Sequence, residues 1–160
     1  MTHFIVLVLA LFIGAVGGLR AFTAPAVMAW AAVLQWINLN GTWVEWLSHP
    51  ATVAILTLLA VGEFVTDQLP STPARTVPMQ FTARILLGGF AGAVLGTAWN
   101  YPWTALGAGI IGAVIGTLVG FRVRQRLVAA NGGHDLPIAL VEDSIAVLGG
   151  LAIAALTAVV

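Results

Sequence analysis

The chain has 160 residues, of which 60% are apolar and 8% are charged, and its mean hydropathy is +1.03. This composition cannot cover a water-soluble globule with polar surface, so it predicts a protein whose solvent is lipid. Six arginines balance six acidic residues and there is no cysteine, which excludes a basic nucleic-acid footprint, disulfide frameworks, thiol catalysis and cysteine-ligated metals.

Long apolar segments separated by short polar breaks predict an all-α polytopic membrane protein of one domain. A helix needs ~20 apolar residues to cross a bilayer, so the chain has room for about six short spans. They are expected at about residues 3–19, 24–38, 50–67, 79–98, 103–121 and 136–158. The first segment has no basic residue before it, so we interpret it as a span and not as a cleaved signal peptide.

Arginines and aromatic residues indicate how the six spans are oriented. The arginines all fall on one face of the membrane, which the positive-inside tendency makes cytoplasmic: Arg20, Arg75, Arg84, Arg122, Arg124 and Arg126. The opposite face receives the aromatic residues typical of a headgroup boundary: Trp36, Trp43, Trp46, Trp99, Tyr101 and Trp103. We therefore expect a multi-pass protein of the bacterial inner (cytoplasmic) membrane with both termini outside.

Three spans followed by three more would put the second half upside down relative to the first. The chain could thus consist of two inverted three-helix repeats, residues 1–70 and 79–160. Only glycines and acidic residues at comparable places support this idea, and homologous and unrelated halves both stay open.

Two predicted spans carry glycines at every fourth position, a glycine-zipper pattern. The residues are Gly88, Gly92 and Gly96 in one span and Gly112, Gly116 and Gly120 in the next. Such spacing lines one helix face with small residues and lets a neighbouring backbone approach closely. We favour packing within the monomer over the alternative, an interface in a homo-oligomer.

The most informative residues are seven ionisable side chains near the cytoplasmic side: Arg20, Glu63, Asp67, Arg75, Arg84, Glu142 and Asp143. A charge in the middle of a membrane helix costs ~2.5–3.5 kcal/mol on insertion scales, so these groups need partners, water or a function. Glu63 and Asp67 are four residues apart and share a helix face. The seven residues can converge on one network, which would be either a scaffold of ion pairs or a site for a substrate or ion.

Helix starts on the same side strengthen the expectation of a site. Three pairs of residues resemble an N-cap followed by a proline in the first turn: Thr23 with Pro25, Thr76 with Pro78, and Asp135 with Pro137. Helix N-termini and arginines together suit an anion, whereas four carboxylates suit a proton or cation. The sequence leaves the sign of the ligand open.

Other kinds of chemistry find no support in the sequence. His3 and His49 fall outside and His134 falls inside, so we expect no metal site, no haem and no other cofactor. The serines have no histidine at useful spacing, so we expect no nucleophilic enzyme. The alternating Arg122, Arg124 and Arg126 are interpreted as an anchor to anionic headgroups.

Several strings of residues resemble a bacterial multispan integral-membrane family of unknown function. They are GLRAFTAP at 18–25 with AWAA at 29–32, ExxxDxLPxxPxRT at 63–76, and ALVED at 139–143. Such families usually place lysine where this chain has Gln68, which removes one ion-pair partner. The resemblance implies a membrane fold and no established activity.

The leading hypothesis from the sequence is a small transporter or channel for an ion or small solute. Glu63 and Glu142 would respond to a proton or cation, the arginines would neutralise them or bind an anionic group, and Asp67 and Asp143 would orient the arginines. The alternative is a structural or lipid- or partner-binding membrane protein whose charges are scaffolding. An enzyme acting on a lipid headgroup ranks last, because no nucleophile or metal set accompanies the acids.

Overall fold

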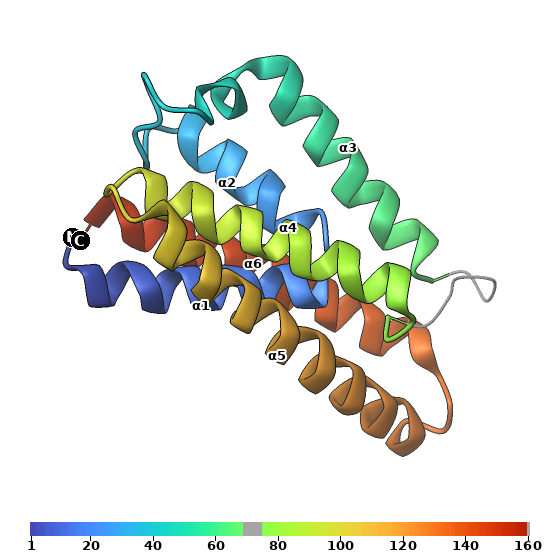
Figure 1. Cartoon of the computed structure of the whole chain (residues 1–160). Helices are drawn as coiled ribbons and strands as arrows, with labels where there is room; N and C mark the ends of the chain where they lie inside the picture. The colour runs from blue at the N-terminus through green and yellow to red at the C-terminus, as the bar shows by residue number, and fades with distance from the viewer. Residues whose placement is uncertain (69–74, 160) are drawn as a thin grey trace.

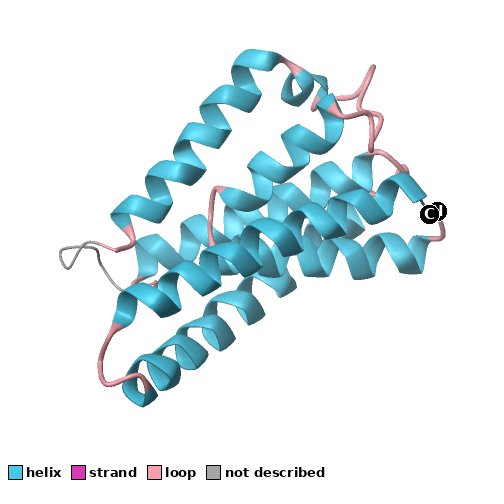
Figure 2. Ribbon diagram, turned by 180° about the vertical axis from the view of Figure 1, so that it is seen from behind, coloured by secondary structure: helices cyan, strands magenta, loops and turns pink. Residues whose placement is uncertain are grey.

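The computed structural model of the chain describes residues 1–68 and 75–159, which form helices and loops without any strand (Figure 2). The helices are α1 (His3–Leu19), α2 (Thr23–Val33), the 3-10 helix η1 (Glu45–Ser48), α3 (Pro50–Thr66), α4 (Pro78–Thr97), α5 (Pro102–Ala130) and α6 (Asp135–Val159). The α-helices alternate in direction, so both termini lie at one end of the bundle (Figure 1). The prediction of an all-α polytopic fold is confirmed.

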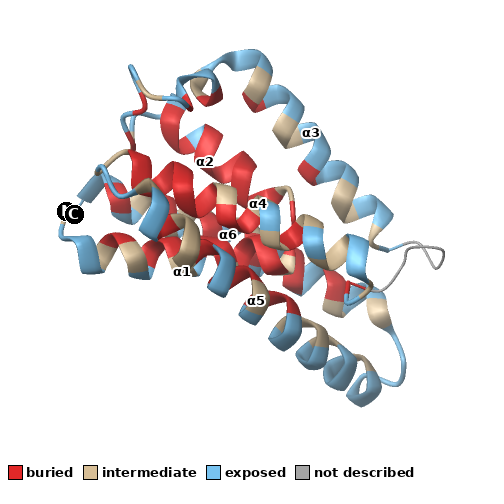
Figure 3. Ribbon diagram, viewed as in Figure 1, coloured by how far each residue is buried: buried red, intermediate tan, exposed pale blue. Residues whose placement is uncertain are grey.

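The outer surface of the bundle is apolar, as expected for a protein surrounded by lipid. Helices α4, α5 and α6 are long and apolar enough to cross a membrane, and α1, α2 and α3 are shorter apolar helices. Large apolar side chains such as Phe4, Leu58 and Leu148 are 75%, 71% and 66% exposed on the flanks of the bundle, where Figure 3 shows mostly exposed residues. Water would disfavour so much apolar surface. The chain is therefore a membrane protein.

The second span is shorter than predicted. α2 ends at Val33 and not near residue 38, because Gln35 adopts a left-handed conformation with a φ of 62°. The N–H of Trp36 donates to the carbonyl of Ala31 over 2.8 Å, which closes the helix in the manner of a Schellman motif. The chain then continues through loops and η1 to the start of α3.

The fifth span is longer than predicted. α5 continues to Ala130 and not to residue 121, so the arginine-rich segment is part of the same helix. Nothing in residues 121–130 interrupts a helix, and the chain turns only at Gly132 and Gly133, whose φ values of 64° and 85° suit glycine. Between the predicted spans at 50–67 and 79–98, the proline-containing break that the sequence predicts at residues 69–73 lies outside the described residues.

Helices α1, α4 and α5 pack closely through glycine-bearing faces. A Cβ atom on Gly112 would overlap the carbonyl oxygen of Leu11, and one on Gly116 would overlap that of Ala15. On α4, a Cβ atom on Gly92 would lie 2.6 Å from the carbonyl oxygen of Ala105. These glycines thus bring three backbones together within one chain.

Helix α3 is held more loosely than the others. It packs against α2 and η1, and only Val53 and Ala60 of its residues are buried. Figure 3 shows it as a largely exposed helix at the side of a buried centre formed by α1, α2, α4 and α6.

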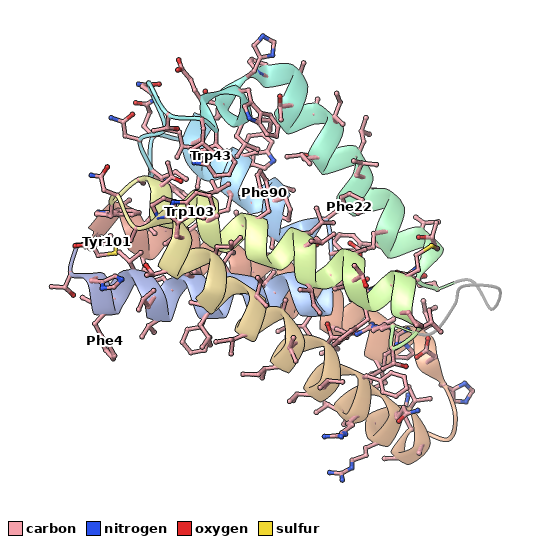
Figure 4. All side chains as sticks on the ribbon, viewed as in Figure 1. Phe4, Phe22, Trp43, Phe90, Tyr101 and Trp103 are labelled. Carbon is pink, nitrogen blue, oxygen red and sulfur yellow. The ribbon has the colours of Figure 1, made fainter. Side chains whose placement is uncertain are left out.

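Aromatic side chains gather at the end of the bundle where the termini lie. Figure 4 shows Trp43, Tyr101 and Trp103 toward that end, whereas Phe22 lies toward the other. Trp43 contacts Phe90 edge-on with 6.1 Å between ring centroids, and His3 stacks on Tyr101 at 4.2 Å. The arginine-bearing turns and this aromatic group therefore occupy opposite ends of the molecule.

Candidate functional site

The candidate site surrounds a break between α1 and α2. α1 ends at Leu19 and α2 begins at Thr23, so residues 20–22 form the turn. α2 has 11 residues and spans ~16 Å, much less than α5 with 29 residues. Arg84 contacts the turn from a position about two helical turns after the start of α4 at Pro78. The turn therefore lies within the bundle and not at its end.

The free backbone groups at this turn are satisfied by one acid and one arginine. Glu63 on α3 accepts hydrogen bonds from the N–H groups of Ala21 (2.7 Å) and Phe22 (2.9 Å) at the start of α2. Arg84 on α4 donates to the carbonyl oxygens of Leu19 (2.7 Å) and Gly18 (3.3 Å) at the end of α1. The two charged groups also lie 3.5 Å apart. Lipid offers no hydrogen-bond partner for the free N–H and C=O groups at a helix end. These contacts therefore satisfy the backbone groups that the turn exposes.

Arg20 is the first residue of the turn and is completely buried. Its guanidinium forms ion pairs with Asp67, and its Nε lies 2.5 Å from a carboxylate oxygen of Asp143. The guanidinium carbon lies 5.8 Å from the centre of the Phe64 ring. Asp67 is shared, because Nη2 of Arg84 lies 3.4 Å from it. Arg20 thus ties the α1–α2 turn to α3 and α6.

Glu142 on α6 is the second centre of the network. Arg75 binds both of its carboxylate oxygens, one of them over 2.6 Å. Nη1 of Arg124 on α5 donates to it over 3.1 Å, and Nη2 of Arg20 lies 3.9 Å away. Gly120 lies next to this arrangement, and a Cβ atom there would overlap the Leu19 side chain but come only into ordinary contact with the Glu142 carboxylate, at 3.6 Å.

The structure brings together all seven ionisable residues named from the sequence, and it adds Arg124 and Asp135. Arg124 donates to both carboxylate oxygens of Asp135, over 2.9 and 2.6 Å, as well as to Glu142. The interpretation of Arg124 as a headgroup anchor is therefore wrong, whereas Arg122 and Arg126 are exposed. The missed signal is the glycine spacing, because Arg124 stands four residues after Gly120 and continues its face of α5.

The predicted helix caps differ from those observed. α2 and α4 have Phe22 and Val77 at their N-cap positions, and no side chain caps either helix from there. Thr23 is instead the first residue of α2, whose N-terminus is capped from a distance by Glu63. Asp135 forms its ion pair with Arg124. Pro78 does occupy the first turn of α4.

The nine residues form what we call the charged cluster: Arg20, Glu63, Asp67, Arg75, Arg84, Arg124, Asp135, Glu142 and Asp143. Four guanidiniums face five carboxylates, which leaves one negative charge in excess. Within residues 1–68 and 75–159, no group of three His, Asp or Glu side chains is arranged to hold a metal ion.

Comparison with known proteins gives a family without an assigned role. A search of curated proteins and a search of solved structures each find no match. The model of the family DUF4126, described as a domain of unknown function, matches residues 7–160 and includes the whole charged cluster. The chain therefore belongs to the DUF4126 family.

Proposed function

We propose that the protein is a small transporter or channel for an ion or small solute, with the charged cluster as its ion-responsive site in the cytoplasmic half of the membrane. The observation that carries the proposal is the buried part of the cluster, in which Arg20, Arg75 and Arg84 face four carboxylates. The Arg124–Asp135 pair, whose aspartate side chain is 46% exposed, adjoins it through Glu142 and adds no net charge. Discontinuous helices whose ends meet polar groups inside the membrane are a common way of building transporter sites.

An uncompensated charge in this environment is unfavourable, and a proton or cation removes it. The same event alters the contacts between helices, because each pair joins different elements. Arg20 joins the α1–α2 turn to Asp67 at the end of α3 and to Asp143 on α6. Uptake of a proton or cation by one of these carboxylates would weaken its ion pair with Arg20. Ion binding would thereby be coupled to separation of α1, α3 and α6 at the end of the bundle that carries the charged cluster.

The contacts distinguish the four buried carboxylates, and the fifth, Asp135, is half-exposed and pairs with Arg124. Glu63 is occupied by two backbone N–H groups, and Asp67 and Glu142 each lie within 4.0 Å of three arginines. Asp143, 8% exposed, has one arginine partner, Arg20. Asp143 beside Glu142 is therefore the best candidate for the responsive group, in place of the Glu63 and Glu142 pair suggested by the sequence.

A flux assay in proteoliposomes tests the proposal. Vesicles loaded with a pH-sensitive dye and potassium, with valinomycin setting the membrane potential, report proton flux, and a sodium-sensitive dye reports sodium flux. We expect protein-dependent flux of one of these ions, reduced at least tenfold by Asp143→Asn or Glu142→Gln. Arg126→Gln, on the exposed end of α5, is the control and should retain wild-type flux. Flux that is absent in the wild type, or unchanged in both acid variants, would contradict the proposal.

One observation favours the alternative, a structural or lipid- or partner-binding protein that moves nothing. Every charged group of the cluster lies near a group of opposite charge, and Glu63 and Arg84 also bind the backbone at the α1–α2 turn. On that hypothesis the acid variants lower thermal stability, and no ion flux depends on the protein. The proteoliposome assay separates the two functions directly.

The orientation of the protein in the membrane is part of the same proposal. Because both termini lie at the end opposite the charged cluster, the positive-inside tendency puts the termini outside and the cluster near the cytoplasm of a bacterial cell (Figure 1). Homo-oligomer formation and the two inverted repeats stay predictions.

A further inference from the structure

A groove of about 410 Å³ opens between α2, α3 and α6. Its volume is in the range of ~300–1,000 Å³ of pockets that hold small ligands. The walls are apolar and include Ala26, Val61, Phe64, Val147 and Leu151. α3, which forms one wall, has only two buried residues, so an occupant of the groove would complete its packing.

One polar atom in the groove has no partner. The Thr23 side chain lines the groove at the start of α2 and is 3% exposed, and in the described part of the chain its hydroxyl makes no hydrogen bond. The other polar side chains of the groove, Trp30 and Thr57, bind each other over 3.0 Å. A buried hydroxyl normally has a partner, so the free one at Thr23 points to an occupant that supplies an acceptor.

The surroundings of Thr23 restrict the chemistry of that acceptor. The Glu63 carboxylate lies beside the α1–α2 turn and binds the N–H of Phe22, the residue before Thr23. A second carboxylate at this place would be repelled, whereas a neutral carbonyl oxygen would not. Thr23 is also at the inner end of the short helix α2, on the side of the bundle where the charged cluster lies. Thr23 therefore lies nearer to this end of the bundle, where a lipid headgroup and its ester linkages would lie, than to the middle of the helices.

We propose that the groove binds one acyl chain of a membrane phospholipid, and that its ester carbonyl accepts a hydrogen bond from Thr23. The chain lies along the apolar walls between α3 and α6. The site is independent of ion transport and holds whether or not the charged cluster conducts ions.

Lipid binding to the delipidated protein in detergent, measured by native mass spectrometry, tests the site with two probes. The first is a diester phosphatidylethanolamine, and the second is its diether analogue, which lacks the carbonyl. For the diester lipid we expect Thr23→Val to weaken binding roughly 2- to 12-fold, as for one lost hydrogen bond. For the diether lipid the same substitution should have no effect. The Thr23→Ser variant, which keeps the hydroxyl, should bind both lipids like the wild type. Equal effects on the two lipids, or no effect on either, would overturn the assignment of Thr23.

A second pair of variants tests the groove itself. Val61 lines the groove and is 51% exposed, so Val61→Phe fills part of it without disturbing the buried centre. It should reduce binding of both lipids at least tenfold. Ile55, 58% exposed on the same helix and not in the groove, provides the matched control Ile55→Phe, which should bind normally. Equal loss in both variants, or tighter binding of palmitic acid than of the diester lipid, would overturn the phospholipid site.

Tryptophan fluorescence gives a measurement that does not depend on Thr23. A protein that keeps only Trp30, which lines the groove, should be quenched saturably by low fractions of acyl-brominated diester lipid in detergent. A protein that keeps only Trp103, which is 82% exposed and outside the groove, should show weak quenching that does not saturate. Identical quenching curves for the two tryptophans would show non-specific partitioning and contradict the site.

Discussion

Replacing Arg20 with methionine should lower the thermal stability of the protein strongly. Arg20 is completely buried, and its removal leaves the Asp143 carboxylate without an arginine partner and takes one of three arginines from Asp67. Three guanidiniums would then face five carboxylates. Removing one partner of a buried ion pair destabilises a protein by about 3–5 kcal/mol. For a chain of this length ~1 kcal/mol corresponds to 2–4 °C, so the melting temperature should fall by roughly 6–20 °C.

The assay is thermal unfolding in detergent followed by circular dichroism. Arg126→Met, which removes the same charge from an exposed position on α5, should change stability by less than about 0.5 kcal/mol. The double variant Arg20→Met with Asp143→Asn should regain part of the loss, because one stranded carboxylate is now neutral. If Arg20→Met melts like Arg126→Met, or if the double variant is less stable than the sum of its parts, the account of the charged cluster as a mutually compensating network is refuted.

Three further predictions follow from the same structure. Gly112→Ala should destabilise the protein, since its Cβ atom would overlap the α1 backbone. Gly149→Ala, which has open space around the added atom, should instead stabilise α6 by about 0.5–1 kcal/mol. The melting temperatures of the two variants check this. Glu63→Gln should cost about 1–3 kcal/mol, measured in the same way, because an amide offers one acceptor oxygen for two backbone donors, and an unchanged melting temperature would contradict the capping role. Cysteines placed singly at His134 and Thr42 should react with an impermeant maleimide from opposite sides of right-side-out vesicles, and labelling of both from one side would contradict the six-helix topology.

Seven of the nine members of the charged cluster could be predicted from the sequence, because a charged group in lipid needs a partner, whereas Arg124 and Asp135 were missed. In an apolar chain every ionisable residue inside a span needs a partner, and the positive-inside tendency places the arginines on one side. With six spans, residues as distant as Arg20 and Asp143 then have to lie in the same layer of the membrane. Which arginine pairs with which acid within that layer could not be predicted. Side-chain pairing depends on the rotation and crossing angles of the helices, and hydropathy does not determine these.

The parts that sequence reasoning missed depend on long-range contacts. α2 was predicted to be longer because residues 34–38 are mostly apolar, but Gln35 takes a left-handed conformation and ends the helix. The caps at Thr23 and Thr76 followed a local rule, whereas the N–H groups at the start of α2 bind Glu63 from a helix 41 residues away. Local rules fail here because a helix end inside a membrane takes its partner from whichever helix is adjacent.

The members of the charged cluster fall into two groups, those that bind the backbone and those that pair with one another, and this difference bears on function. Glu63 and Arg84 are the charged members that bind the backbone of the α1–α2 turn, because one accepts from its N–H groups and the other donates to its carbonyl oxygens together with the Thr117 hydroxyl. The other seven members form pairs mostly with one another, around Arg20 and Glu142. Packing alone does not require such pairs, since apolar residues of similar volume in place of a buried ion pair are often neutral or stabilising. A purely structural bundle would therefore need only two charges at this turn, and the additional seven, three arginines and four acidic residues, are the reason for proposing an ion-responsive site.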